Sequence, residues 1–266
     1  MTPAPPTWEI DHRRLAHTRF SEIRCFDEIG STNAELLDEA RLGGPEGVVA
    51  VADVQTAGRG RLGRAWSATP GTALLVSVLL RPRLPPSRLA AITMAAGLAV
   101  ADGVERVAGF RPALKWPNDL VVADRKLAGI LAESTAEGGD APLVVGVGLN
   151  VSTGAYPDEL AGAATSCEEE AGRPVDRVEL LVAFLDALES RYATAMGPDG
   201  AEVTLAEYRA GSATLGRLVR VELPNGSVLE GLARQIAWNG QLIVVDASGG
   251  HTAVHTGDVV HLRPAD

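Results

Sequence analysis

Residues 48–66 of this chain read VVAVADVQTAGRGRLGRAW, and they decide which folds the sequence allows. The apolar run at their start predicts a buried strand, and the aperiodic residues that follow predict a loop. Within the loop, GRGRLG has the spacing GxGxxG, but arginines alternate with the glycines and no helix follows. A dinucleotide-binding turn needs apolar residues that pack a helix against the strand. The stretch therefore argues against a Rossmann site, and without a closing Gly-Lys-Ser/Thr it is not a P-loop either.

The same loop has the chemistry of an anion-binding site. Its glycines let backbone N–H groups converge, and Arg59, Arg61 and Arg64 supply charged donors for carboxylate and phosphate oxygens. The whole chain has a net charge of −10, so a local cluster of cations favours a substrate with several negative charges. ATP together with a carboxylate would fit, and a solvated basic loop tip is the alternative interpretation.

Helices and strands are expected to alternate on both sides of this loop. A helix is expected to begin near Ser31, where Thr32 and Glu35 have the spacing of a capping box, and to end at 43–45. Further strands are expected at 73–80, 120–123, 127–134 and 143–150, and further helices at 87–108, 176–196 and 202–210. Ser87 is the expected N-cap of the helix 87–108.

The pattern of the sequence changes near residue 216. From there polar and apolar residues alternate, and the Asn-Gly pairs at 225–226 and 239–240 are hairpin signals. Residues 216–263 therefore predict a small β-barrel of five or six short strands. The Pro-rich start predicts a lead-in with a short helical piece. The expected division is a lead-in 1–20, a larger domain of helices and strands 21–212 and a barrel domain 213–266.

Composition excludes several classes of protein. The two cysteines and five histidines have no spacing typical of a disulfide framework or a zinc site. The N-terminus lacks the apolar segment of a signal peptide, and no apolar run approaches the ~20 residues of a membrane span. We therefore expect a cytoplasmic protein without a membrane partner. The net charge of −10 argues against a general nucleic-acid binder, so no DNA partner is expected.

Two further motifs carry charged side chains. KWPND at 115–119 places Asn118 and Asp119 on a turn, where their oxygens suit a magnesium–phosphate complex, and Lys115 adds a positive charge. KLAGI at 126–130 starts with Lys126 at the entry to a buried strand, where it can meet a carboxylate or phosphate. The alternatives are an ordinary Asn-Asp turn and a lysine that reaches from a strand end to solvent.

These motifs, taken in their order along the chain, resemble those of the biotin protein ligases. STN at 31–33, the 55–66 loop, KWPND, KLAGI, GVGLN at 146–150 and the Leu-Arg ending at 262–263 follow one another over residues 25–263. The resemblance implies an α/β (α+β) catalytic domain, with a mixed β-sheet flanked by helices, and an SH3-like C-terminal β-barrel. It also implies a two-step reaction. Biotin and ATP, with Mg²⁺, form biotinyl-5′-AMP, and a lysine of a biotin carboxyl carrier protein domain then takes the biotinyl group.

The resemblance assigns roles to individual residues. Lys126, Arg59 and Arg61 are the expected catalytic residues, with Lys126 closest to the reacting carboxylate. The positions matched to biotin are Ser31, Thr32, Asn33, Gln55, Gly58, Arg59, Gly60, Arg61, Lys126 and Gly129. The positions matched to ATP or the adenylate are Arg64, Trp66, Lys115, Asn118, Asp119, Asn150 and Arg263, with Asp119 also the expected Mg²⁺ ligand. Trp66 is expected to stack on adenine when the loop closes.

The sequence departs from the family pattern in two places. Leu62 stands where the loop often carries another basic residue, which affects one phosphate contact. No winged-helix DNA-binding module precedes the motifs, so a ligase without a repressor role is expected. Family members pair through exposed sheet edges, and a weak homodimer is expected on the same ground.

Three other functions compete with the ligase hypothesis. A lipoate or octanoyl ligase or transferase shares the fold and also acylates a carrier lysine, although the arginine-rich loop favours biotin. A nucleic-acid binder would use the same loop and the barrel, against the net charge of −10. A sensor that binds biotin without chemistry would carry the same pocket.

Overall fold

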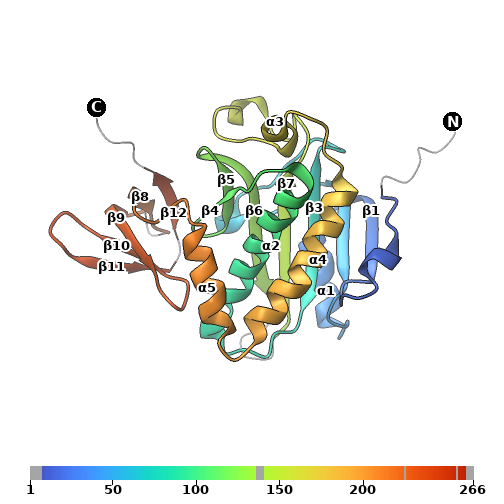
Figure 1. The fold of residues 1–266 in the computed structure, drawn as a ribbon, viewed down its shortest axis with the longest axis horizontal. Coiled ribbons are helices and arrows are strands. Elements are labelled where there is room, and N and C mark those ends of the chain that lie inside the picture. Colours follow the sequence, from blue (N-terminus) through green and yellow to red (C-terminus); the bar gives the residue numbers. More distant parts are fainter. Residues whose placement is uncertain (1–7, 136–140, 225, 256, 262–266) are drawn as a thin grey trace.

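The computed structural model of the chain describes residues 8–135, 141–224, 226–255 and 257–261 (Figure 1). Its larger part is built on a seven-stranded mixed sheet in the order β1-β2-β3-β7-β6-β5-β4. The strands are β1 Ile23–Ile29, β2 Val49–Gln55, β3 Ala73–Leu80, β4 Ala113–Lys115, β5 Asp119–Val122, β6 Arg125–Ser134 and β7 Leu143–Asn150. β1 runs parallel to β2, and every other neighbouring pair is antiparallel.

Helices cover both faces of this sheet. They are α1 Thr32–Arg41, α2 Ala90–Ala108, α3 Cys167–Ala171, α4 Arg177–Met196 and α5 Gly200–Ala210, with 3₁₀ turns η1 His12–Leu15, η2 Arg61–Gly63, η3 Pro86–Arg88 and η4 Asp158–Leu160. In Figure 1, α2 and α4 lie in front of the sheet and α1 lies behind it.

The sequence of β2 explains why both faces are buried. Its side chains alternate between the faces, as those of every strand do. Val49 and Val51 belong to the main core under α2 and α4, whereas Ala50 packs with Leu36 and Leu37 of α1 in a second cluster. A strand that is apolar on both faces needs a layer on each side, and the result is a three-layer body.

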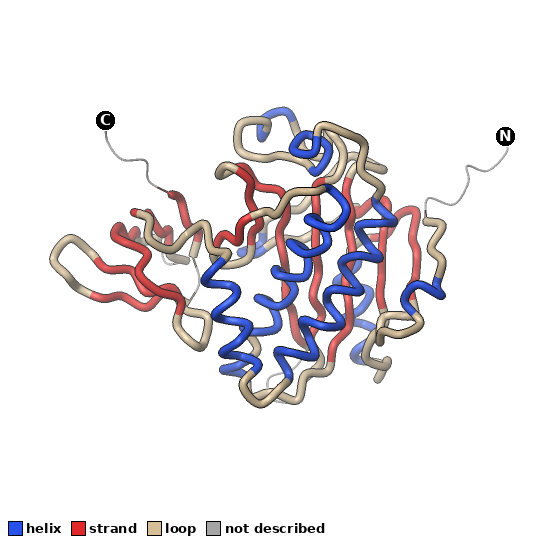
Figure 2. The backbone as a smooth tube through the Cα atoms, viewed as in Figure 1, coloured by secondary structure: helices blue, strands red, loops and turns tan. Residues whose placement is uncertain are grey.

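The C-terminal residues form a second sheet, separate from the first (Figure 2). It contains β8 Leu218–Glu222, β9 Val228–Ile236, β10 Leu242–Val245, β11 His251–Val254 and β12 Asp258–His261, all antiparallel, in the order β11-β10-β9-β8-β12. Five strands agree with the expected number. Pairing among the described residues leaves this sheet open, because β11 and β12 are its edges, whereas the sequence predicts a small β-barrel. The division of the chain at residues 212 and 213 stays a prediction.

Trp116 ties the two sheets together. Its side chain is 2% exposed, and its indole Nε1 donates to the carbonyl of Gly240, 2.8 Å away in the β9–β10 turn. Its backbone N–H donates to Thr214 Oγ1 at 3.0 Å. Asp124, in the β5–β6 turn, pairs with Arg217 at 2.6 Å from just before β8. The turn that leads into β5 and the hairpin that leads into Lys126 are therefore both fixed against the second sheet.

Three local expectations are wrong. The N-cap of α1 is Ser31, whose extended backbone lets its hydroxyl accept from the Ala34 N–H, so Thr32 is already the first helical residue. Ser87 caps no helix, because residues 86–88 form the 3₁₀ turn η3 and α2 starts at Ala90. The turn before β6 is at 123–124, both with positive φ, so Lys126 lies inside the strand.

β1 was not expected, and its composition explains why. The residues IRCFDEI have neither a clean alternation nor an apolar run, and the strand is only partly buried at the sheet edge. None of the helices in the described ranges is long and apolar enough to cross a membrane.

Replacing Gly103 with valine tests the packing of α2 on α4. A Cβ at Gly103 would lie 3.1 Å from the backbone nitrogen of Phe184, which cannot move without shifting α4. Overpacking at a helix contact costs about 1–3 kcal/mol, so we expect Gly103→Val to lower the free energy of unfolding by about that amount in urea. Gly162→Val is the matched control, because nothing lies within 4 Å of a Cβ there. Equal stability of the two variants would contradict this packing.

Candidate active site

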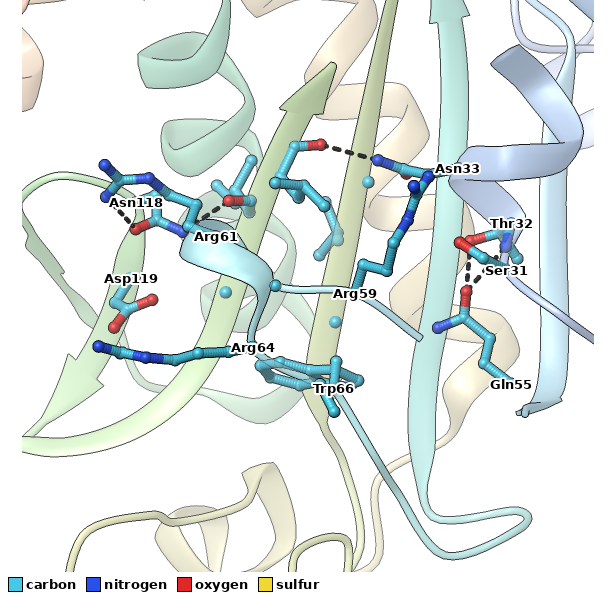
Figure 3. A pocket seen from close by; sticks show the side chains of 18 of the residues that line it. Ser31, Thr32, Asn33, Gln55, Arg59, Arg61, Arg64, Trp66, Asn118 and Asp119 are labelled. Atoms are coloured by element: carbon cyan, nitrogen blue, oxygen red, sulfur yellow. Dashed lines mark hydrogen bonds between the residues drawn. The ribbon is translucent and has the colours of Figure 1, made fainter. Parts of the chain in front are cut away.

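One pocket lies on the α1 face of the large sheet, beside the start of α1 (Figure 3). It encloses about 760 Å³ of empty space, its open mouth included. Its walls come from α1, β2, the arginine-rich loop, β5, β6, β7 and β12. Segments that are far apart in the sequence therefore meet around one cavity.

Most of the predicted site residues line this pocket. They are Ser31, Thr32, Asn33, Gln55, Arg59, Gly60, Arg61, Arg64, Trp66, Asn118, Asp119, Lys126 and Gly129. Gly58, Lys115 and Asn150 are not among the lining residues. Arg263 lies outside the described residues. Proximity alone assigns no ligand, so the individual contacts to biotin and ATP stay predictions.

Gly58 and Asn150 support the pocket from outside. A Cβ at Gly58 would lie 2.3 Å from the carbonyl oxygen of Trp66, where the two ends of the loop run side by side. Asn150 is 4% exposed, and its Nδ2 donates to the carbonyls of Thr165 and Lys126 at 3.0 and 3.4 Å. Both residues therefore fix the position of the backbone next to the pocket, Gly58 at the ends of the loop and Asn150 at Lys126 and Thr165.

Hydrogen bonds fix the polar end of the pocket. Gln55 Oε1 accepts from the backbone N–H of Thr32 at 2.8 Å, which leaves the Gln55 amide nitrogen facing the cavity (Figure 3). Thr32 Oγ1 lies 2.7 Å from the hydroxyl of Ser77, and Asn33 Nδ2 donates to Glu133 Oε2 at 2.7 Å. The side chains that line the cavity at this end are neutral, which suits a polar uncharged group of a ligand; they are Ser31, Thr32, Asn33 and Gln55.

Trp66 lies flat against a floor made of two glycines. Gly129 and Gly148 face each other across β6 and β7, and a Cβ at Gly148 would lie 2.4 Å from the indole Cε2 of Trp66. A Cβ at Gly129 would lie 3.1 Å from the Cζ3 of the same ring. The ring rests on the sheet only because both positions lack a side chain, and its buried Nε1 has no hydrogen-bond partner.

Cations surround the middle of the pocket. Lys126 Nζ lies 2.7 Å from Asp119 Oδ1 and 5.4 Å from the centre of the Trp66 ring. The Asp119 oxygen is buried and receives no well-aligned hydrogen bond, so its contact with Lys126 is an ion pair only. Lys115 faces Asp119 across β4 and β5, and burial lowers the pKa of Lys115 against the opposing effect of Asp119.

The three loop arginines are each anchored at a different place. Arg59 Nη2 lies 3.3 Å from Glu133 Oε2, Arg61 donates to Asn118 Oδ1 at 3.1 Å, and Arg64 pairs with Asp258. Burial lowers the pKa of Arg61, although Asp119 acts against that shift. Four cations, those of Lys126 and the three arginines, therefore line the pocket with only two carboxylates, Asp119 and Asp258. This excess of positive charge suits a negatively charged substrate.

Four residues in or beside the pocket were not predicted from the sequence: Ser77, Leu131, Glu133 and Asp258. Ser77 had a signal, because it is the only polar residue of the buried strand ALLVSVLL. The composition also carries a signal for the predicted lysines, because the chain has 22 arginines but only two lysines, Lys115 and Lys126. In the structure both lysines face Asp119. Asp258 had no signal, because it comes from the second sheet.

Two parts of the sequence match known families. Residues 26–150 match the Biotin/lipoate A/B protein ligase family, and residues 214–262 match the Biotin protein ligase C terminal domain. The chain is 43% identical over 266 residues to the biotin–[acetyl-CoA-carboxylase] ligase of Mycobacterium tuberculosis, with 96% of each covered. It is 35% identical over 164 residues to the bifunctional ligase/repressor BirA of Escherichia coli, a match that covers 61% of this chain and 50% of that protein.

Solved structures of biotin protein ligases have a similar fold. The fold superposes on the biotin protein ligase from Aquifex aeolicus in complex with biotin and ATP with a TM-score of 0.77 and 27% identity, covering 92% of this chain and 100% of the other. It superposes on the biotin protein ligase from Leishmania major in complex with biotin with a TM-score of 0.61 and 26% identity, covering 88% and 98%.

Replacing Gly148 with alanine tests the glycine floor. Because the new Cβ would overlap the rigid indole, we expect Gly148→Ala to move Trp66 off the sheet and expose it to acrylamide quenching of its fluorescence. The same substitution in a Trp66→Phe background should leave quenching unchanged, since the remaining tryptophans lie elsewhere. Gly162→Ala, in open space, is the control. Unchanged quenching in Gly148→Ala would show that Trp66 does not lie on this floor.

Proposed function

Because the chain belongs to the biotin protein ligases, we propose that it activates biotin with ATP to biotinyl-5′-AMP and transfers the biotinyl group to a carrier lysine. The observation that supports this most is the pocket beside α1, in which a neutral polar end adjoins a group of cations. Biotin has a matching division, because its ring is neutral and polar and its carboxylate is charged. The acceptor that we propose is the biotin carboxyl carrier domain of an acyl-CoA carboxylase, in line with the name of the mycobacterial relative.

The first step brings two anions together. A carboxylate oxygen of biotin attacks the α-phosphorus of ATP, and the bond from that phosphorus to the pyrophosphate oxygen breaks. Lys126, Arg59 and Arg61 line the pocket and can shield the repulsion between the two anions. Lys126 is the residue that we place at the reacting carboxylate. Because these cations are already held by carboxylate and amide partners, little reorganisation is needed when the substrates arrive.

Magnesium would be held by few protein groups. Among the described residues, no group of three or more His, Cys, Asp and Glu side chains could hold a metal ion. Mg²⁺ commonly binds through one or two carboxylates together with substrate phosphates. Asp119 would supply one such carboxylate, in place of its ion pair with Lys126. The ion would neutralise phosphate charge in the adenylation step.

The second step transfers the acyl group. The lysine nitrogen of the carrier attacks the acyl carbon of the mixed anhydride, the bond to the phosphate oxygen breaks, AMP leaves, and the amine loses a proton. The anhydride is sensitive to water, so the loop over it has to close. Trp66 ends that loop beside Gly58, and we propose that it stacks on adenine.

Some expectations from the sequence stay predictions. They are the absence of a DNA-binding role, the weak homodimer and the cytoplasmic location. Lipoate remains the alternative substrate, since the family that matches residues 26–150 includes lipoate ligases by name.

The variant Lys126→Ala tests whether Lys126 acts at the reacting carboxylate. Loss of the cation at the reacting carboxylate should lower biotin-dependent exchange of labelled pyrophosphate into ATP at least about 100-fold. Arg13→Ala is the control, because Arg13 is 91% exposed and pairs with Asp11 far from the pocket. Exchange with lipoate but not with biotin would show that the chain is a lipoate ligase instead. A folded and active Lys126→Ala enzyme would remove Lys126 from the reaction.

Limited trypsin digestion tests the closure of the loop. The enzyme can cut after Arg59, Arg61 and Arg64, and we expect biotin with ATP to slow these cuts because the loop packs on the adenylate. Cutting after the exposed Arg13 should not change. Equal rates at the loop with and without ligand would argue against closure.

A further inference from the structure

Ser77 is a buried hydroxyl in the middle of β3, beneath the polar end of the pocket. It is 0% exposed and does not line the cavity. Its neighbours on the strand are apolar. A hydroxyl in such a place has to be satisfied by hydrogen bonds, and its two partners are the side chains of Thr32 and Asn33.

The orientation of Asn33 follows from its other contacts. One end of its amide lies 2.7 Å from Glu133 Oε2 and 3.2 Å from the carbonyl oxygen of Leu131. An ionised carboxylate and a carbonyl can only accept, so this end has to be the NH₂ group. The amide oxygen of Asn33 therefore faces Ser77, at 2.6 Å. Gly146 makes room for this arrangement, because a Cβ there would lie 2.1 Å from that oxygen.

The orientation of Asn33 in turn fixes the two hydroxyl protons. Asn33 Oδ1 can only accept, so Ser77 uses its single proton to donate to it. Ser77 Oγ can then only accept from Thr32 Oγ1, 2.7 Å away. Gln55 Oε1 lies farther from the same hydroxyl, at 3.1 Å, and already accepts from the Thr32 backbone N–H at 2.8 Å. The Thr32 proton therefore goes to the closer Ser77 Oγ, which has no other proton to share. Thr32 Oγ1 is left with lone pairs toward the pocket and no proton.

We propose that Ser77 is a specificity-determining positioning residue, which makes Thr32 Oγ1 an acceptor for a ring N–H of the substrate. This inference rests on the proposed function, because it concerns the biotin end of the same pocket. The chain of hydrogen bonds runs from Glu133 through Asn33 and Ser77 to Thr32, and each link allows one direction only. The cyclic urea of biotin carries two N–H donors that match this acceptor. The dithiolane ring of lipoate carries no N–H donor, so the Thr32 Oγ1 acceptor selects against lipoate.

Ser77→Ala removes the hydroxyl that holds the proton of Thr32. The freed Thr32 hydroxyl can then turn and donate into the pocket, so it no longer presents only an acceptor. We expect the Kd and KM for biotin to rise about two- to tenfold, the range of one hydrogen bond, with kcat of pyrophosphate exchange nearly unchanged. Ser190→Ala, on the exposed side of α4, is the control. If Ser77→Ala does not fold, Ser77→Cys keeps the volume with a much weaker donor and takes its place.

A double-mutant cycle separates this role from a structural one. Thr32→Val keeps the shape of Thr32 but has no hydroxyl to orient, so Ser77→Ala should add little to the Kd for biotin in that background. A merely structural Ser77 would cost the same in both backgrounds. Equal, additive penalties would therefore overturn the inference.

Substrate analogues give a second readout. In a cyclic carbamate analogue of biotin, one ring N–H is replaced by oxygen, and two such isomers exist. The wild-type enzyme should discriminate against the isomer that lacks the N–H facing Thr32. Ser77→Ala should reduce this discrimination, because the freed Thr32 hydroxyl can donate to the ring oxygen. Unchanged discrimination would contradict the inference.

Biotin binding by the wild type, by calorimetry and by pyrophosphate exchange, is measured first. Its absence would overturn the proposed function and this inference together. Binding and exchange with additive Ser77 and Thr32 penalties would overturn this inference and leave the proposed function standing.

Discussion

The site depends on the close approach of one aromatic ring to the backbone of the sheet. Trp66 can lie on β6 and β7 only because Gly129 and Gly148, paired across these strands, have no side chains. Since Trp66 ends the arginine-rich loop and its backbone N–H bonds to Gly58 at 3.0 Å, the ring fixes where the loop crosses the sheet. The arginines then reach anchors on β5, β6 and β12. A side chain at Gly148 would lift this assembly from the sheet, and one at Gly129 would crowd the ring.

The second constraint is electrostatic. The chain has a net charge of −10, yet its pocket gathers cations, and each would be costly to bury alone. The structure offsets this cost with local partners: Asp119 for Lys126, Glu133 for Arg59 and Asp258 for Arg64. These pairs are partly exposed, so they orient the cations more than they stabilise the fold. A substrate with phosphate and carboxylate groups thus meets cations that are already oriented.

The agreement between sequence and structure varies with how local each feature is. β3, β7 and α4 lie within a residue of their expected positions, because their apolar patterns are strong and their ends carry clear signals such as Asp176. The cap of α1 was misplaced by one residue, because the hydroxyl of Thr32 contacts Ser77 Oγ at 2.7 Å and does not cap its own helix. β1 was missed because an edge strand needs no continuous apolar run.

The sequence alone determined the order of the motifs, the positive charge of the loop, the two lysines and the change to short strands near residue 216, since these features are local. Only the tertiary structure decided which distant groups meet. Ser77 and Asn33 are 44 residues apart, and Asn33 and Glu133 are 100 apart. They touch because the sheet order places β3, β7 and β6 next to one another beneath α1. The direction of a hydrogen bond depends on every partner at once, and no sequence pattern encodes such a set of contacts.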